Sequence, residues 1–137
     1  RPRPVPTLLN GHAVVVGYGR VGKLIADGIK GRLPLLVVEE GAVGDLGIEH
    51  IRGNAARDDV LAAANLGAAQ ILFVAIPEAF EAGQIVEQAR RTNPKLPIVA
   101  RAHFEAEVDH LLAHGASQVI MGEREIAMAM LDFARTA

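Results

Sequence analysis

Cysteine and tryptophan are absent from this 137-residue chain, and aromatic residues of any kind are scarce. Without cysteine there are no disulfides, no thiolate catalysis and no cysteine-bound metal, and a reducing compartment suits the chain at least as well as any other. One Tyr, four Phe and a formal net charge of −2 argue against a nucleic-acid ligand, which needs a basic face or stacking aromatics. We therefore expect no nucleic-acid partner.

Long apolar runs are also missing, although 50% of the residues are hydrophobic. A membrane-spanning helix needs about 20 consecutive apolar residues, and no signal-peptide pattern is present. The only serine, Ser117, stands in no G-x-S-x-G elbow. His110 and His114 have a helical metal spacing but lack the glutamate of H-E-x-x-H, so we interpret them as solvated. We expect a soluble cytoplasmic domain with no membrane insertion, no metal and no catalytic set.

The strongest motif lies between His12 and Gly22. Residues 13–16 are apolar and mostly β-branched, as in a buried strand, and they lead into a complete G-x-G-x-x-G and then a helical segment. Gly17 permits the tight turn, Gly19 lets the backbone approach a phosphate, and Gly22 lets the helix pack closely. The predicted nucleotide-binding loop consists of Gly17, Tyr18, Gly19, Arg20, Val21 and Gly22.

Apolar strand segments alternate with helical segments along the chain. The strands are expected at residues 13–16, 35–38, 48–52, 70–76, 98–101 and 118–121, and the helices at 21–30, 55–65, 78–91, 104–114 and 122–134. Residues 41–47 hold three glycines and would make a poor helix. The pattern predicts a Rossmann-like α/β fold, in which a doubly wound parallel six-stranded sheet of order 3-2-1-4-5-6 lies within three α/β/α layers.

The two ends of the chain differ from this alternating pattern. Residues 1–6 are cationic and rich in proline, so we expect residues 1–11 to be a linker, or a frayed terminus, in front of a domain at residues 12–137. Ile126, Met130 and Phe133 are spaced to form one apolar stripe on the last helix. Two interpretations of this stripe stay open: it forms a dimer surface, or it completes the core.

Ligands of such sheets bind beyond the carboxyl ends of the strands. Glu39 ends the second strand, where its carboxylate would accept hydrogen bonds from the hydroxyls of an adenosine ribose. The same charge would repel a 2′-phosphate, so NAD or another unphosphorylated ribose is favoured over NADP. The alternative is an ordinary solvated carboxylate at a strand end.

Further candidates follow the neighbouring strands. Asn54 and Ala55 come after the third strand and Ile76 after the fourth, so these residues are expected to flank the adenine. Arg20 and Arg101 are expected to contact phosphate, because a guanidinium can make paired hydrogen bonds with it. The alternatives are a turn role for Asn54, a surface position for Arg20 and a salt bridge for Arg101.

Several stretches together resemble the TrkA-N nucleotide-binding domain, also called RCK or KTN, of bacterial potassium channels and cation–proton antiporters. They are HAVVVGYGRVG (12–22), VVE (37–39), RGNAARDDVLAAANL (52–66), VAIPEAFEAGQIVEQAR (74–90) and IVARAHFEAEVDHLLAHGASQVIMGEREIA (98–127). The second half is most similar to antiporters of the YbaL/Kef type. Many relatives have Asp where Asn54 stands, and residues 41–47 are shorter and richer in glycine than the usual second crossover helix.

The resemblance implies a regulatory domain rather than an enzyme. Such a domain binds NAD(H) or an adenine nucleotide such as AMP or ATP, and it forms dimers. It lies on the cytoplasmic side of the bacterial inner membrane and is attached to a transporter domain of the same polypeptide. Gly17, Gly19, Gly22, Arg20, Glu39, Asn54, Ala55 and Arg101 match its nucleotide-contacting positions. Two alternatives stay open: the cofactor-binding fragment of an NAD-dependent dehydrogenase, which would need a second domain, and a nucleotide-free scaffold that only dimerises.

Overall fold

Six parallel strands form one sheet in the computed structural model, which describes residues 3–44 and 47–137. The order is β3-β2-β1-β4-β5-β6, with β1 and β4 at the centre. The strands are β1 (Ala13–Val16), β2 (Leu35–Glu39), β3 (His50–Arg52), β4 (Ile71–Val74), β5 (Ile98–Ala102) and β6 (Gln118–Met121). The predicted Rossmann-like topology is therefore confirmed.

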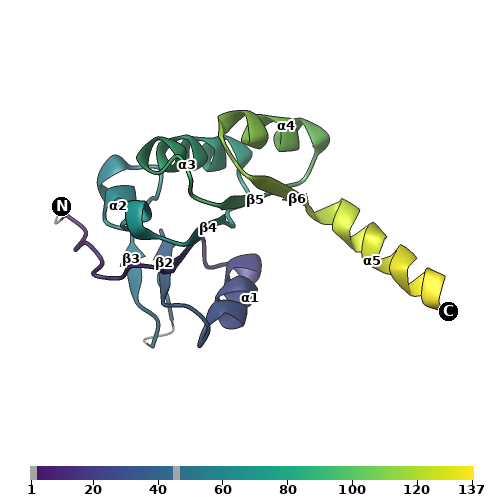
Figure 1. Cartoon of the computed structure of the whole chain (residues 1–137), viewed down its shortest axis with the longest axis horizontal. Helices are drawn as coiled ribbons and strands as arrows, with labels where there is room; N and C mark the ends of the chain where they lie inside the picture. The colour runs from purple at the N-terminus through teal and green to yellow at the C-terminus, as the bar shows by residue number, and fades with distance from the viewer. Residues whose placement is uncertain (1–2, 45–46) are drawn as a thin grey trace.

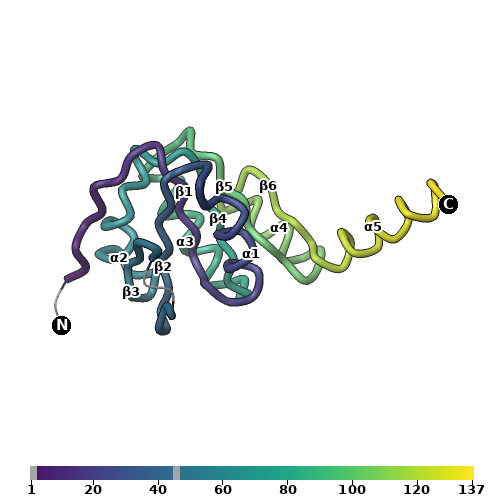
Figure 2. The backbone as a smooth tube through the Cα atoms, turned by 90° about the horizontal axis from the view of Figure 1, so that it is seen from below, coloured from purple at the N-terminus to yellow at the C-terminus, as the bar shows by residue number. Residues whose placement is uncertain are grey.

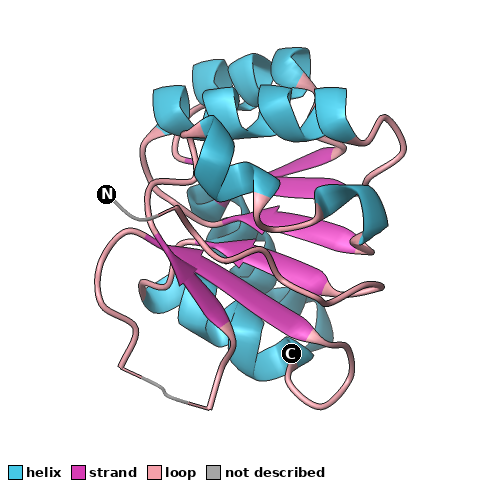
Figure 3. Ribbon diagram, turned by 90° about the vertical axis from the view of Figure 1, so that its left-hand side faces the viewer, coloured by secondary structure: helices cyan, strands magenta, loops and turns pink. Residues whose placement is uncertain are grey.

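Helices cover the two faces of the sheet unequally (Figures 1 and 3). The helices α2 (Asp58–Ala62), α3 (Ala79–Thr92) and α4 (Glu105–His114) pack on one face, over the larger apolar core. The other face carries α1 (Arg20–Ile29), beneath β1 and its neighbours (Figure 1). A smaller apolar cluster around Val15 and Val37 lies on the α1 side.

The helix predicted over residues 55–65 is shorter than expected. Helix α2 spans only Asp58–Ala62, and a 3-10 turn η1 (Leu66–Ala68) follows it. Two asparagines account for the difference. Asn54 accepts a hydrogen bond from the backbone N–H of Ala56 and so holds a turn, and Asn65 adopts a left-handed conformation with φ of 52° that interrupts the helix.

The glycine-rich connection between β2 and β3 is not helical where the structure describes it. Val43 and Ile48 are buried and pack under β2 with Val37. These two apolar side chains cover the sheet where a crossover helix would otherwise lie. Asp45 and Leu46 of the same predicted segment lie outside the described residues.

The chain ends behave differently from one another. Thr7 is buried, donates its hydroxyl to Glu49 and its N–H to the carbonyl of Ala63, and so lies against the body of the fold. Helix α5 (Gly122–Thr136) instead projects from β6 into solvent, as Figures 1 and 2 show. Phe133 on this helix is 76% exposed. The alternative in which its apolar stripe completes the core of this chain is therefore wrong.

Candidate nucleotide-binding site

The glycine loop joins β1 to α1 at the carboxyl edge of the sheet. Gly17 has a positive φ of 98°, which side chains rarely adopt, and its N–H donates to the carbonyl of Val38. A Cβ on Gly22 would lie 1.9 Å from the carbonyl oxygen of Gly17. Only glycine fits at position 22, because any side chain there would push the first turn of α1 away from the loop.

Gly19 differs from the other two motif glycines. A Cβ placed there would meet no atom within 4 Å, and its φ of −80° is open to any residue. Packing therefore gives no reason for glycine at this position, and the free space lies at the start of α1, where no side chain caps the helix. Uncapped N–H groups and the positive end of the helix dipole favour an anion there. Arg20 is the first helical residue and is exposed.

Glu39 lies directly across from the glycine loop. One carboxylate oxygen accepts from the N–H of Tyr18 at 2.7 Å, and the other accepts from the N–H of Gly41 at 2.6 Å. These bonds use two of roughly four acceptor positions of the carboxylate. The side chain is thus held in place by the backbone and keeps acceptor positions for a ligand hydroxyl.

A shallow pocket of about 80 Å³ opens at this edge of the sheet. Five of the predicted site residues meet in its wall, namely Gly17, Glu39, Asn54, Ala55 and Ile76. They come from the ends of four different strands, β1 to β4, so the sheet order brings them together. Ala55 is buried and Ile76 is half-buried, which gives the pocket an apolar wall beside its polar groups.

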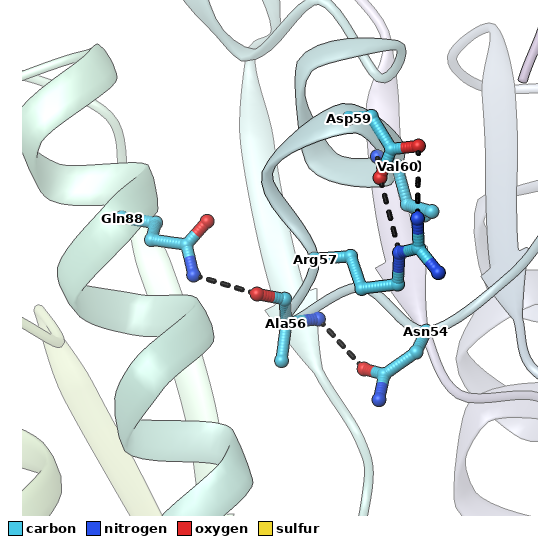
Figure 4. A network of polar contacts seen from close by, with 6 residues as sticks. All are labelled: Asn54, Ala56, Arg57, Asp59, Val60 and Gln88. Carbon is cyan, nitrogen blue, oxygen red and sulfur yellow. Dashed lines mark hydrogen bonds and ion pairs between the residues drawn. The ribbon is translucent and has the colours of Figure 1, made fainter. Parts of the chain in front are cut away.

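Asn54 has a turn role, shown in Figure 4, and it also lines the pocket. Its side-chain oxygen accepts from the N–H of Ala56 at 2.8 Å, while the carbonyl of Ala56 accepts from the amide of Gln88 on α3. Arg57 and Asp59 form an ion pair in the same turn. Within the part of the chain that the structure describes, the amide nitrogen of Asn54 donates to no other group, so its N–H groups are free to meet a ligand.

The remaining predicted residues do not line this pocket. Arg101 and Val21 line a separate apolar cavity of about 430 Å³ on the α1 side of the sheet. The Arg101 guanidinium donates to the carbonyl of Ala75 at 3.4 Å, at the end of β4. The ring of Tyr18 lies under the ammonium of Lys23, 5.5 Å from its centre. Tyr18 and Val21 belong to the glycine loop itself, and neither they nor Arg101 line the small pocket.

Two carboxylates that the sequence interpretation did not include line the same pocket, Glu40 and Glu81. Burial raises the pKa of the Glu81 carboxyl, and the negative charges of Glu40 and Glu78 raise it further. Glu81 lies in the first turn of the helix after β4, and this position could have predicted from the sequence that it lies near the site. The strand register also places Arg52 opposite Glu39 on the neighbouring β3, although these residues are 13 positions apart in the chain.

The TrkA-N domain profile matches residues 13–122. The chain belongs to the TrkA-N domain family. This TrkA-N domain is 40% identical, over 98% of its length, to the "Putative cation/proton antiporter YbaL" of Escherichia coli (strain K12). It spans only 25% of that relative.

Solved structures agree with this assignment. The crystal structure of the TrkA-N domain of the inner membrane protein YbaL from Escherichia coli matches with a TM-score of 0.87 and 41% identity, over 93% of this chain and 98% of that one. The Kef C-terminal domain of Shewanella denitrificans in its AMP-bound form matches at 0.78 and 28% identity, over 91% and 79%. The GsuK channel bound to NAD shares the fold at 0.75 and 18% identity, over 85% and 22%.

Two features are absent from the described residues, 3–44 and 47–137. No group of three or more His, Asp or Glu side chains there is arranged to hold a metal ion. No helix there is long and apolar enough to cross a membrane.

Proposed function

We propose that this TrkA-N domain binds NAD(H) or an adenine nucleotide such as AMP or ATP, and that it regulates a monovalent cation (potassium)/proton antiporter. The observation that best supports this proposal is that the glycine loop, Glu39 and Asn54 meet at one pocket in a chain 40% identical to YbaL. The phosphates lie at the start of α1, the ribose hydroxyls bond to Glu39, and the adenine lies between Ala55 and Ile76.

The charges around the pocket support an unphosphorylated ribose. Glu39, Glu40 and Glu81 line the pocket, whereas Arg52 is one strand away. Three carboxylates against one guanidinium repel a 2′-phosphate, so NAD(H) and AMP bind more tightly than NADP(H). Within the related structures, AMP is bound to the Kef domain and NAD to the GsuK channel, which supports both ligand classes.

The remaining elements of the proposal are those that the family resemblance implies. The domain lies on the cytoplasmic side of the inner membrane, attached to a transmembrane transporter domain of the same polypeptide, and pairs as a homodimer. Residues 12–137 form the nucleotide-binding domain, and residues 1–11 are a connecting segment that rests on it through Thr7. Nucleotide binds the two dimer arrangements with different affinity, and this difference biases transport. The domain itself catalyses no reaction.

Calorimetric titration of the chain with AMP, ATP, NAD, NADH and NADPH tests the binding proposal. We expect heat of binding for AMP and NAD(H) and a weaker response to NADPH. Replacing Glu39 by Gln, which keeps an acceptor for the Tyr18 N–H, should weaken AMP binding about tenfold or more, because a charged hydrogen bond contributes roughly 1.5–3 kcal/mol.

Asp109→Ala is the matched control, since this carboxylate is exposed on α4, on the far side of the sheet from the glycine loop. It should bind AMP as the parent does. Absence of binding for every nucleotide would contradict the proposal and favour the scaffold alternative. Steady hydride transfer from NADH to a small carbonyl would favour the dehydrogenase alternative instead.

A further inference from the structure

The side of the pocket that is expected to face the adenine includes a turn at residues 54–57, between β3 and α2. The N–H of Arg57 donates to the carbonyl of Asn54 at 3.0 Å, and the N–H of Ala56 donates to the side-chain oxygen of Asn54. Because the oxygen is held in this way, the amide nitrogen of Asn54 lies on the side away from Ala56 (Figure 4). The shape of the turn therefore decides where the free N–H groups of Asn54 point.

One hydrogen bond ties this turn to a distant part of the fold. Within residues 3–44 and 47–137, the other hydrogen bonds of residues 54–57 join them only to one another and to α2. The exception comes from α3, where the Nε2 of Gln88 donates to the carbonyl of Ala56 at 2.8 Å (Figure 4). Without this bond, the turn would be held against α3 only by the apolar contacts of Ala55 and Ala56 with the core.

Helix α3 is a firm support for such a contact. Ile85, Val86 and Ala89 on this helix are fully buried against the sheet. Glu81, two helical turns before Gln88, lies on the same face of α3 and lines the pocket. The helix thus meets the site at two places, directly through the carboxylate of Glu81 and indirectly through the amide of Gln88.

We propose that Gln88 is a positioning residue for the base of the nucleotide, because it holds the turn in the shape that directs the amide of Asn54 at the ring nitrogens of adenine. This inference rests on the proposed function and adds to it a residue outside the pocket. Gln88 lines a different, open cavity of about 330 Å³ between α2 and α3. It therefore acts on a nucleotide beside Glu39 only through Ala56 and Asn54.

The variant Gln88→Glu tests this role, because the carboxylate has the length of the amide but no N–H to donate. We expect the affinity for AMP, measured by calorimetry, to fall about fivefold or more. Ribose 5-phosphate lacks the base, so its affinity should stay that of the parent. Gln84→Glu is the matched control, since it adds the same charge at an exposed position one turn earlier on α3, and it should bind both ligands as the parent does.

A double variant tests whether Gln88 acts through Asn54. Asn54→Asp keeps an oxygen for the N–H of Ala56 but removes the amide donors, so it should weaken AMP binding by itself. Adding Gln88→Glu to Asn54→Asp should cause no further loss of AMP affinity, because the group that Gln88 positions is already gone.

Hydrogen exchange of the Ala56 amide, followed by nuclear magnetic resonance without any nucleotide, tests the hold on the turn separately. We expect this amide to exchange about fivefold faster in Gln88→Glu than in the parent, and at the parent rate in Gln84→Glu. If no nucleotide bound the parent, the proposed function would fail, whereas an unchanged exchange rate in Gln88→Glu would overturn the positioning role by itself.

Two further results would overturn the role of Gln88. Equal losses of affinity for AMP and for ribose 5-phosphate would show that Gln88 supports the whole site rather than the base. Additive losses in the double variant would show that its effect does not pass through Asn54.

Discussion

At the residue scale, the three glycines of the G-x-G-x-x-G motif serve different purposes. Gly17 supplies a left-handed turn, Gly22 allows α1 to touch the carbonyl of Gly17, and Gly19 leaves open space at the helix start. The fold itself needs Gly17 and Gly22. Packing does not require Gly19, and so this is the glycine whose presence indicates a ligand.

Gly22→Ala should destabilise the protein by about 2 kcal/mol or more, because the added Cβ would overlap the Gly17 oxygen and the loop must move. Urea unfolding measures this loss. Gly19→Ala is the matched comparison and should leave the free energy of unfolding unchanged while weakening AMP binding. Equal losses of stability in both variants would show that a Cβ at position 19 also meets other atoms of the protein.

Glu81 should make the fold less stable as the pH rises. Burial and the charges of Glu40 and Glu78 raise its pKa in the folded state, so the folded protein binds a proton that the unfolded chain has already released. The stability falls as the pH rises from the ordinary carboxyl pKa to the raised one. Glu81→Gln should therefore be more stable than the parent at neutral pH and gain little in acid, as denaturant midpoints at both pH values will show.

Glu107 is a control for that experiment, because its pKa is shifted in the opposite direction to that of Glu81. The N–H of His103 donates to its carboxylate and holds its pKa below the usual value, against an opposing effect of burial. Its contribution is present above the ordinary pKa and is lost as the pH falls through the lowered one. Glu107→Gln should thus be less stable than the parent at neutral pH. The same sign of change for both variants would contradict this account.

At the scale of elements, Arg90 connects the end of α3 to its neighbours. Its guanidinium donates to the carbonyls of Asn93, Pro94 and Leu96 in the loop before β5, and to the carbonyl of Gly115 at the end of α4. The contacts with Gly115 are 3.0 and 2.8 Å long. One planar fork therefore satisfies carbonyls from two connections on one face of the sheet.

Arg90→Lys should destabilise the protein by about 2–3 kcal/mol, because an ammonium cannot reach these carbonyls together and would leave several of them unpaired. Arg91→Lys is the neighbouring control. Arg91 is exposed and pairs with Glu87 on the surface, so its replacement should change the free energy of unfolding by less than about 0.5 kcal/mol. Similar values for the two variants in urea titrations would argue against a connecting role for Arg90.

At the scale of the whole molecule, the chain consists of a packed sheet and a helix that stands apart from it. The helices α2, α3 and α4 complete one face, while the other is covered by α1, Val43 and Ile48 on one half and stays bare on the other half. If the proposed homodimer buries this uncovered half of the sheet and α5, folding is coupled to association.

The melting temperature of the parent chain should therefore rise with protein concentration, since dimer formation stabilises the folded state by mass action. A chain that ends at Met121 lacks α5 and should melt at one temperature throughout the same dilution series. It should still respond to AMP, because no residue of α5 lines the pocket beside Glu39. Concentration-independent melting of the parent would contradict the proposed homodimer.

Much of the fold and of the pocket was predictable from local sequence. The strand segments and the glycine motif identify the sheet and its order, and five predicted residues meet at one pocket at the carboxyl edge. Glu40 and Glu81 were missed because they stand in exposed-looking acidic stretches, and their place in the pocket depends on how β2 and α3 approach each other. The length of α2 was missed because Asn54 and Asn65 act through backbone geometry that a helical pattern does not reveal.

What the sequence determined by itself is the class of the molecule: a TrkA-N fold with a glycine loop at residues 17–22 and an acidic residue at the end of the second strand. These features are local, because a strand, a glycine turn and a helix follow one another within a few residues. Only the tertiary structure decided that Arg52 pairs with Glu39 in the strand register, that Glu81 lines the pocket, and that α5 leaves its own sheet. Each of these depends on long-range packing, and an apolar stripe such as that of α5 indicates that a surface will be covered without saying by what.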